Sequence, residues 1–560
     1  MHSNANGTQG QTDWNYVNWR KTNRIVRNLR QRIFRATTEG NMKKVRSLQK
    51  LMLRCYSNRL QSVRKVTQHN RGKYTPGVDQ AVVKTPAARG KLVAQLANYQ
   101  PWKARPARRV YIPKAKGKQR PLSIATISDR CLQAVVKNAL EPEWEARFEC
   151  SSYGFRPGRS PHDAIQKIYG LSLPHKRKKW VLDADIRSCF DQISQPFLLE
   201  TIDMFPAREL IRQWLKAGYL QERRWYPTEA GTPQGSVVSP LLANIALHGM
   251  ETALGVKYRA CKGGVNLLSK RAVVRFADDF VVFCETQEDA EASRRILDEW
   301  MKVRGLTLSP DKTQIVHLST GFDFLGFNIR HYPVPQTTTG WKLLIKPSKQ
   351  SVQKIRNKLR QIWLDHLGKP IDVLLNKLNS VIRGQAHYYR IGVSSRIFSQ
   401  LDSWMYQRAK RFTKRTHPHK SGYWRVAKYW GRFNLDRPLD RWVFGSKQTG
   451  AYLLKFRWFP IQRHVLVKGY SSPDDSNLRD YWRQREKAKV KTELIPSRQK
   501  IAKRQDYVCP VCGESLLNGE DLQLHHRKPL AQGGDDSYKN LQLLHLYCHH
   551  QVHSGTVNSS

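Results

Sequence analysis

Apolar residues recur at helical spacing near the amino terminus of the chain. Between residues 14 and 66, Arg and Lys fill the faces that these apolar positions leave open. The recurring apolar positions are Ile25, Leu29, Ile33, Val45, Leu48 and Met52. The pattern predicts a basic helical arm, to which we assign residues 1–74.

Short β-rich runs then alternate with amphipathic helices over residues 75–335. The runs read "RRVYIP", "KWVLDADI", "AVVRFA" and "DDFVVFC", and one of the helices is expected at about 286–304. This mixture predicts an α+β domain, the largest of the chain.

Beyond residue 340 the pattern becomes helical and basic. Ser348 can cap a helix with an apolar face, and two more helical stretches follow, the first of which we expect Gly384 to end. The apolar face comprises Val352, Ile355, Leu359 and Ile362. We predict a helical domain over 340–440, a segment of little periodicity rich in Lys, Arg, Trp and Tyr over 441–500, and a compact Cys/His-rich tail over 501–560.

Composition adds the cellular setting. A chain of 560 residues is too long for one core and indicates several domains. No apolar run approaches the ~18 residues of a membrane span, and the polar start resembles neither a secretory signal nor a transit peptide. Six of the nine cysteines lie far apart, unlike a disulfide framework. We therefore expect a cytoplasmic bacterial protein that makes no use of a membrane.

The charge is strongly one-sided. Lys and Arg number 97 against 44 Asp and Glu, a formal net charge of +53. Solubility asks for a charge of only about 2–8 per small domain, so several domains would not sum to this value. A long nucleic acid is the polyanion that would neutralise it.

Two adjacent aspartates interrupt the apolar stretch "RFADDFVVF" of this basic chain. Neighbouring residues on a strand face opposite sides, so Asp278 and Asp279 can share a metal site only if a turn at Ala277 and Asp278 joins two strands. Asp185 ends another β-rich run and can be carried to the same tip. Each alone has a plainer interpretation, as a surface-turn aspartate or a helix cap. Together, three carboxylates in a basic domain indicate Mg²⁺, and two such ions about 3.5–4 Å apart can clamp a phosphoryl transfer.

Seven strings in order make the pattern specific. They are "KGKQRPL", "SSYGFRPGRS", "VLDADIRSCFD", "GTPQGSVVSPLLANI", "RFADDFVVF", "LTLSPDKT" and "FDFLGFNI". Their order resembles the reverse transcriptases of group II introns, and the basic arm, "VIRGQAHYYR" and the tail extend the resemblance over nearly the whole chain. It implies a multidomain α+β fold: a right-hand polymerase with fingers and palm, a helical thumb or maturase domain, a DNA-binding segment and a ββα-metal HNH zinc domain.

The resemblance also implies roles for residues of the polymerase. Asp185, Asp278 and Asp279 would bind two Mg²⁺ ions, with the main-chain carbonyl of Ile186 completing one coordination shell. Further positions are expected to contact the incoming nucleotide, the nascent base pair or the active site: Lys114 and Arg120 at the triphosphate, Phe190 as a sugar gate, Gln234 beside the base pair in a loop with Gly231 and Gly235, and Lys312 near the metals. From the residues alone, Phe190 could equally be a core aromatic, and Lys114 and Arg120 a solvated basic loop.

Two positions depart from the family pattern. Phe276 stands where most relatives have tyrosine, which keeps the ring and loses a hydroxyl. Gln80 stands where glycine is usual.

In the helical domain, exposed basic and aromatic side chains are expected to grip structured RNA, although a small helical core is the simpler interpretation of the apolar stripes alone. These side chains are Arg383, His387, Tyr388, Tyr389 and Arg390.

The tail carries two sets of metal-binding residues. Cys509 and Cys512, with His545 and Cys548, offer four ligands suited to tetrahedral structural Zn²⁺. The second set resembles the HNH nucleases, which implies that His525, His549 and His553 hold one divalent ion, that His526 deprotonates water, and that Asn540 orients His526. Mg²⁺ is the expected nuclease ion, although imidazole also suits Zn²⁺ or Ni²⁺. The plainer alternative is that these histidines are zinc ligands or surface groups.

Together these features predict a multifunctional mobile-intron protein. It would be an RNA-directed DNA polymerase that uses dNTPs, a maturase that binds group II intron RNA, and an endonuclease that cuts target DNA. Two rivals remain from the residues: an RNA-binding splicing chaperone without an active polymerase, and a nuclease-led homing enzyme in which the polymerase portion only binds nucleic acid.

Overall fold

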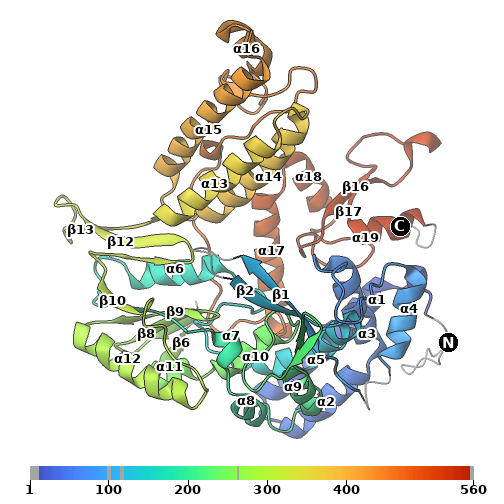
Figure 1. The fold of residues 1–560 in the computed structure, drawn as a ribbon, viewed down its shortest axis with the longest axis vertical. Helices are drawn as coiled ribbons and strands as arrows, with labels where there is room; N and C mark the ends of the chain where they lie inside the picture. Colours follow the sequence, from blue (N-terminus) through green and yellow to red (C-terminus); the bar gives the residue numbers. More distant parts are fainter. Residues whose placement is uncertain (1–11, 98–101, 114–118, 262–263, 555–560) are drawn as a thin grey trace.

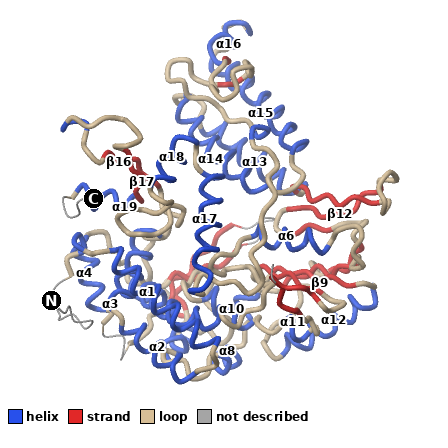
Figure 2. The backbone as a smooth tube through the Cα atoms, turned by 180° about the vertical axis from the view of Figure 1, so that it is seen from behind, coloured by secondary structure: helices blue, strands red, loops and turns tan. Residues whose placement is uncertain are grey.

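The computed structural model describes residues 12–97, 102–113, 119–261 and 264–554. Figure 1 shows a broad base, in which the amino-terminal helices lie beside the sheets, and a tower of helices that projects from it. The carboxyl-terminal tail lies at the side of the tower, directly above the amino-terminal helices, in both Figure 1 and Figure 2.

The basic arm is helical, as the pattern predicts. Its elements are α1 (Trp19–Thr38), α2 (Met42–Arg54), α3 (Tyr56–Arg64) and α4 (Pro86–Gln95), packed with α5 (Ile127–Glu145). Asn18 and Asn41 cap α1 and α2 through their side-chain oxygens. Ile33, Val45 and Met52 are fully buried, so the apolar stripe faces a core, while most of the basic residues remain outside and Arg64 is buried.

A four-stranded sheet follows the arm. Its order is β2-β1-β4-β5, and its strands are β1 (Ala107–Pro113), β2 (Gln119–Ile124), β4 (Tyr219–Gln221) and β5 (Arg224–Tyr226). The intervening chain forms α6 (Pro161–Leu171), α7 (Cys189–Gln192), α8 (Gln195–Thr201) and α9 (Arg208–Lys216). The 75–80 stretch contains Gln80 at φ 53°, a left-handed conformation that the usual glycine adopts without the Cβ crowding of about 1–2 kcal/mol.

The second four-stranded sheet carries the paired aspartates. It has the antiparallel order β10-β3-β9-β8, from strands β3 (Trp180–Asp185), β8 (Ala272–Phe276), β9 (Asp279–Cys284) and β10 (Gln314–His317). Phe280 and Val282 join one hydrophobic cluster, whereas Val281 and Phe283 join the other. Burial on both faces explains why β9 is continuously apolar after its first residue.

Helices and short strands surround this sheet. They are α10 (Ser239–Ala246), α11 (Met250–Ala253), β6 (Tyr258–Cys261), β7 (Gly264–Leu267) and α12 (Gln287–Lys302). A three-stranded sheet then leads out of the base: β11 (Phe322–Phe324), β12 (Phe327–Pro333) and β13 (Trp341–Pro347).

The projecting tower contains α13 (Lys349–Asp365), α14 (Ile371–Tyr389), α15 (Ser395–Thr416) and α16 (Gly422–Tyr429). Ser348 caps α13 as predicted, accepting a hydrogen bond from the Ser351 amide at 3.2 Å. The prediction that Gly384 ends a helix is wrong, because Gly384 lies inside α14. Ala386 and Tyr389 continue the buried face of that helix beyond the glycine, and this packing maintains it.

The segment 441–500 is more ordered than its pattern indicates. It pairs β15 (Val443–Phe444) with β14 (Trp430–Gly431) and contains α17 (Arg479–Glu493), followed by α18 (Pro496–Arg504). Among the described side chains of α17, only Val490 is buried. The helix therefore has no row of apolar residues at helical spacing from which the sequence could predict it. The tail folds as β16 (Leu522–His526), β17 (Leu541–His545) and α19 (Leu546–His553). Among the described residues, no helix has the length and apolarity to cross a membrane.

Candidate active sites and metal centres

The three aspartates predicted to meet are carried to one hairpin. Strand register places Asp185 directly opposite Asp279, and Asp278 lies in the tight turn between β8 and β9. Directly opposed residues project to the same face of a sheet, so the carboxylates of Asp185 and Asp279 share a face. Ala277 makes the turn possible with φ 60°. The hairpin thus brings together acids that lie about ninety positions apart in the chain.

A lysine lies at the same acids. The Lys312 ammonium pairs with the Asp185 carboxylate, and the Asp185 carbonyl accepts a hydrogen bond from the Ser309 amide at 2.8 Å. Ile186 forms a bridge with Leu308 of the same loop. Among the described residues, two clusters of His, Cys, Asp or Glu have all their ligand atoms within 4.8 Å of one another, and both lie in the tail. The carboxylate oxygens of the three aspartates are therefore farther apart than the ligand atoms of those clusters. Lys312 therefore balances part of their charge in this conformation.

A glycine brace holds the hairpin tip. A Cβ on Gly154 would lie 2.2 Å from the Ala277 nitrogen, so a larger residue would displace the turn. The Tyr153 amide donates to the Arg275 carbonyl at 2.9 Å. The buried Arg275 guanidinium donates to Asn244 Oδ1 at 3.1 Å and to the Ala277 carbonyl at 3.3 Å. No pattern in the chain singles out these supporting residues, although Tyr153 and Gly154 lie in "SSYGFRPGRS", Asn244 in "GTPQGSVVSPLLANI" and Arg275 in "RFADDFVVF".

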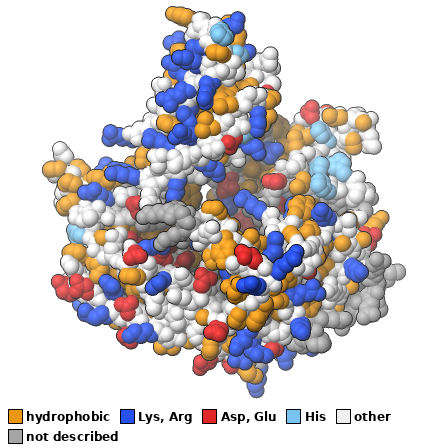
Figure 3. Space-filling model, viewed as in Figure 1, with side chains coloured by type: hydrophobic (Ala, Val, Ile, Leu, Met, Phe, Trp, Pro, Cys, Tyr) orange, Lys and Arg blue, Asp and Glu red, His pale blue; other side chains and the backbone are white. Residues whose placement is uncertain are grey.

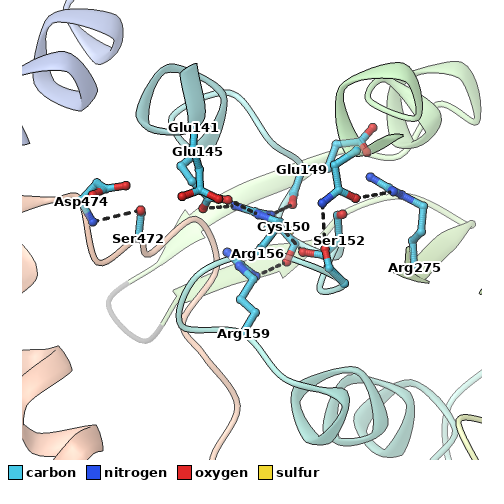
Figure 4. Close-up of polar contacts among 12 residues, drawn as sticks. Glu141, Glu145, Glu149, Cys150, Ser152, Arg156, Arg159, Arg275, Ser472 and Asp474 are labelled. Atoms are coloured by element: carbon cyan, nitrogen blue, oxygen red, sulfur yellow. Dashed lines mark hydrogen bonds and ion pairs between the residues drawn. The ribbon is translucent and has the colours of Figure 1, made fainter. Parts of the chain in front are cut away.

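Behind this brace lies a buried arginine network (Figure 4). Arg156 contacts both carboxylate oxygens of Glu145, at 2.9 and 3.0 Å. Its Nη1 also donates to the carbonyls of Glu149 and Ser152, at 2.7 and 3.0 Å. The bonds to Glu145 therefore tie α5 to the loop around Gly154, and the bonds to the two carbonyls hold that loop closed on itself.

The tail forms a two-stranded sheet covered by a helix, and its histidines converge. One ring nitrogen from each of His525, His549 and His553 lies within 4.8 Å of the others. The His549 and His553 Nε2 atoms are 3.1 Å apart, as their spacing on one face of α19 predicts. Three imidazoles at this spacing fit a divalent cation.

The neighbouring His526 has an unexpected partner. Its Nε2 lies 2.8 Å from Asp536 Oδ1. Asn540 instead accepts from the Lys528 amide at 2.8 Å and donates to the carbonyls of Lys528 and Asp535, at 2.9 and 2.8 Å. Asn540 therefore closes the loop and Asp536 is the side chain in contact with His526, while the orienting role expected of Asn540 stays a prediction. Asp536 belongs to the polar turn "GGDD", which offers no signal of this contact.

The second tail cluster is buried. Cys509, Cys512, His545 and Cys548 place their ligand atoms within 4.8 Å of one another. His545 Nε2 lies 3.0 Å from the Ser515 carbonyl, while Nδ1 lies 3.3 Å from Cys512 Sγ. If Nε2 carries the ring proton and donates it to the Ser515 carbonyl, Nδ1 keeps a lone pair that can bind a metal held among the cysteines. Hydrogen bonds from Cys512 and Cys548 hold the pKa of the Cys509 thiol well below its usual range. This donor set fits Zn²⁺.

Four family models match successive parts of the chain. They are "N-terminal domain of reverse transcriptase" at residues 14–96, "Reverse transcriptase (RNA-dependent DNA polymerase)" at 112–329, "Group II intron, maturase-specific domain" at 352–430 and "HNH endonuclease" at 509–555. The Escherichia coli protein YkfC is 35% identical over 306 residues, which cover 47% of this chain and 78% of YkfC. The chain belongs to the group II intron-encoded reverse transcriptases.

Two other relatives of this intron-encoded reverse transcriptase are matched over a smaller share of their own length. The group II intron-encoded protein LtrA of Lactococcus lactis is 28% identical over 54% of this chain and 63% of its own length. An uncharacterized 91 kDa protein in a cob intron of Schizosaccharomyces pombe is 31% identical over 51% of this chain and 43% of its own length. The chain thus spans 63% of the length of LtrA and 43% of the length of the cob intron protein.

The predicted nucleotide contacts of the reverse transcriptase gather around Asp191. Gln234 Nε2 donates to Asp191 Oδ2 at 3.3 Å, and the Gln234 carbonyl accepts from the Ser123 amide of β2 at 2.6 Å. Burial raises the pKa of the Asp191 carboxyl, and the positive charges of Arg109 and Arg120 oppose this shift. Asp191 is the residue that sequence reasoning missed here, although it lies within the quoted string "VLDADIRSCFD".

Phe190 is half-buried beside the same loop. Its ring meets that of Phe155 edge-on, with centroids 6.2 Å apart. The Phe190 carbonyl accepts from the Thr232 amide at 2.6 Å, and a Cβ on Gly231 would lie 2.5 Å from that carbonyl oxygen. Gly231 thus permits the close approach expected of this loop. Lys114 lies outside the described residues.

The aromatic segment of the maturase-specific domain does not point outward as predicted. Tyr389 is 6% exposed. The Tyr388 hydroxyl donates to the Leu325 carbonyl at 2.9 Å, and Arg390 Nε donates to the Pro460 carbonyl at 3.0 Å. His387 is half-buried, and Arg383 remains exposed. Most of this segment therefore anchors the thumb to the base, because the bulky rings fill the joint between α14 and the β11–β12 turn.

Proposed function

We propose that the palm hairpin is the polymerase site. Asp185, Asp278 and Asp279, with the Ile186 carbonyl, would hold two Mg²⁺ ions, which supply charge stabilisation for phosphoryl transfer when bound. The oxygen donors of these residues fit a hard cation. The observation that carries the proposal is the cross-strand register of Asp185 with Asp279 beside the Asp278 turn.

The chain's own residues would position the substrates. Arg120, together with Lys114, offers positive charge to the dNTP triphosphate, and Arg can do so through a planar fork. Phe190 would exclude a 2′-hydroxyl, while Gln234 would lie against the nascent base pair. Lys312 compensates the Asp185 carboxylate and would remain near the reacting phosphates.

The tail would cut DNA. His525, His549 and His553 would hold one divalent ion; Mg²⁺ is the physiological candidate, and the imidazole set also fits Zn²⁺ or Ni²⁺. His526, whose ring is held by the Asp536 carboxylate, would take a proton from water. Asn540 would fix the loop that carries Asp536. Cys509, Cys512, His545 and Cys548 would hold a structural Zn²⁺.

These activities would form one route. The maturase-specific domain and the basic arm would bind group II intron RNA, and the segment 441–500 would contact target DNA. The nuclease would cut one strand, and the exposed 3′-hydroxyl would prime copying of the inserted intron RNA. The proposed domain limits are 1–74, 75–335, 340–440, 441–500 and 501–560, in a nucleic-acid-associated bacterial protein.

Paired variants test the two catalytic sites. Asp278→Ala should abolish Mg²⁺-dependent primer extension on an RNA template while leaving target nicking intact, whereas His526→Ala should do the reverse. Glu299→Ala on the exposed face of α12 and His550→Ala on the exposed face of α19 are matched controls that should retain both activities. If the wild-type protein promotes splicing but makes no cDNA, the splicing chaperone is the better description; if Asp278→Ala leaves intron mobility intact, the nuclease-led enzyme is.

A further inference from the structure

The nuclease tail is fastened to the amino-terminal arm by hydrogen bonds between main chain and side chain. Asn23 Nδ2 of α1 donates to the Cys512 carbonyl at 3.2 Å. In the other direction, Gln551 Nε2 of α19 donates to the carbonyls of Asn15 and Val17, at 2.7 and 3.1 Å. The segments joined lie at opposite ends of the chain, and Figures 1 and 2 show them side by side.

The apolar core also crosses this junction. Buried side chains of the arm and the tail belong to one hydrophobic cluster, which includes Trp14, Trp19, Leu60, Val63, Cys512, Leu516, Leu543 and Cys548. A shared core of this kind resembles the interior of a domain more than a transient contact between domains. The Cys/His cluster therefore lies at the junction rather than within an independent tail.

One arginine of the arm reaches the cluster itself. Arg64, the last residue of α3, is 4% exposed. Its Nη2 donates to Cys548 Sγ at 3.1 Å, and its Nε donates to His69 Nε2 at 3.1 Å. The guanidinium carbon lies 4.3 Å from the Trp19 ring centre. A buried guanidinium is stable only where such partners compensate its desolvation.

An acidic side chain of the tail completes the arrangement. The Glu520 carboxylate is 5% exposed and lies 3.9 Å from Arg64 Nη2, 3.3 Å from His69 Nε2 and 3.9 Å from His545 Nδ1. The polar groups that face Arg64 are thus a thiol sulfur, a carboxylate and an imidazole. Two of the three come from the tail, so the arm supplies positive charge where the tail concentrates negative charge.

We propose that the Cys509, Cys512, His545 and Cys548 site is an interdomain metal site, in which Arg64 is a positioning residue for the Cys548 thiolate. This inference rests on the proposed Zn²⁺ site. An N–H donor to a metal-bound sulfur disperses the negative charge of the thiolate and fixes its direction. A bound metal would hold the Cys548 sulfur where it accepts from Arg64 Nη2, and loss of the metal would free this partner of the buried guanidinium to move.

Metal binding and docking are therefore linked. If docking of the arm onto the tail makes Zn²⁺ binding more favourable by some free energy, bound Zn²⁺ makes the docking more favourable by the same amount. The coupling fixes the position of the nuclease histidines relative to the polymerase. The consequence is that zinc loading should govern the order of α1 and α3, which belong to the reverse transcriptase and contain no zinc ligand.

The first experiment measures zinc retention by the full-length protein. Zn²⁺ content is determined by mass spectrometry, and its transfer to a chromogenic chelator is followed for the wild type, Arg64→Met, Arg64→Lys and Arg54→Ala. Arg54 is an exposed arginine at the end of α2 and serves as the matched control. Loss of an outer-shell partner should weaken metal affinity by about 10–100-fold in Arg64→Met. Arg64→Lys should fall between, and Arg54→Ala should match the wild type.

The second experiment measures the reverse effect and needs no Arg64 variant. Amide hydrogen exchange of the wild type is compared before and after Zn²⁺ removal. Peptides from α1 and α3 should lose protection, while peptides from α15 in the distant tower should not. Primer extension by each variant reports that the polymerase remains folded.

The outcomes separate the two proposals. If the wild type holds no stoichiometric Zn²⁺, the proposed zinc site is wrong, and this inference is overturned with it. If the wild type holds Zn²⁺, but Arg64→Met and Arg54→Ala release it at the same rate and α3 keeps its protection after zinc removal, the zinc site stands and the interdomain role of Arg64 is overturned.

Discussion

Single residues in the palm show how burial decides the worth of an ion pair. The side chains of Arg156 and Glu145 are each 1% exposed and meet through two bonds, whereas those of Arg212 and Glu209 also meet at 2.7 Å but are 51% and 56% exposed. Water and salt screen the second pair, so its geometry alone stabilises little. Removing one partner of the first pair leaves an uncompensated charge in the core.

We therefore expect Arg156→Ala to lower the free energy of unfolding by about 3–5 kcal/mol. Primer extension should fail at a lower temperature for the same reason, because Arg156 holds the loop behind Gly154. Arg212→Ala should cause no measurable change. Urea denaturation followed by tryptophan fluorescence provides the measurement, and equal midpoints for the two variants would contradict the argument.

Individual helices show where pattern reading succeeds. The arm and α13 follow apolar stripes that face a core, and they form as predicted. α17 was missed because its packing rests on aromatic and charged contacts: the Trp482 indole donates to the Ser472 carbonyl at 2.8 Å, and Arg485 Nη1 donates to the Val465 carbonyl at 2.8 Å. Contacts of this kind leave no period in the sequence.

The two faces of α14 should have separate roles. Arg383 is exposed and can reach an RNA phosphate, whereas the Tyr388 hydroxyl is committed to the Leu325 carbonyl. Arg383→Ala should weaken intron RNA binding and reduce the slope of log affinity against log salt by about one. Tyr388→Phe should leave RNA affinity unchanged and lower thumb stability by about 1 kcal/mol. Filter binding across a salt series and thermal unfolding distinguish these effects, and the reverse pattern would restore an RNA-contacting role to Tyr388.

The whole molecule distributes its charge unevenly. Figure 3 shows Lys and Arg gathered over the tower helices, and acidic side chains over the lower left of the base near α12. On the face that Figure 3 shows, the tower therefore presents a largely basic surface, whereas the base carries basic and acidic side chains together.

This distribution predicts strongly salt-dependent binding. If about 6–10 phosphates are contacted, affinity for nucleic acid should fall about 10³- to 10⁵-fold between about 50 and 200 mM salt, because bound counterions are released from the polyanion. Titrations of the full chain with structured RNA across this range provide the measurement. A slope near zero would mean that the charge does not face the ligand.

The sequence by itself determined the class of chemistry and the main modules. Paired aspartates in an apolar strand, two sets of metal-ligand spacings and the net charge depend on residue type and short-range periodicity, which the chain states directly. Only the tertiary structure decided which groups meet across long separations: Lys312 with Asp185, Asp536 rather than Asn540 with His526, and Arg64 with Cys548. Such pairs depend on strand register, on loop path and on a core shared by opposite ends of the chain, and these are set by packing that no local pattern records.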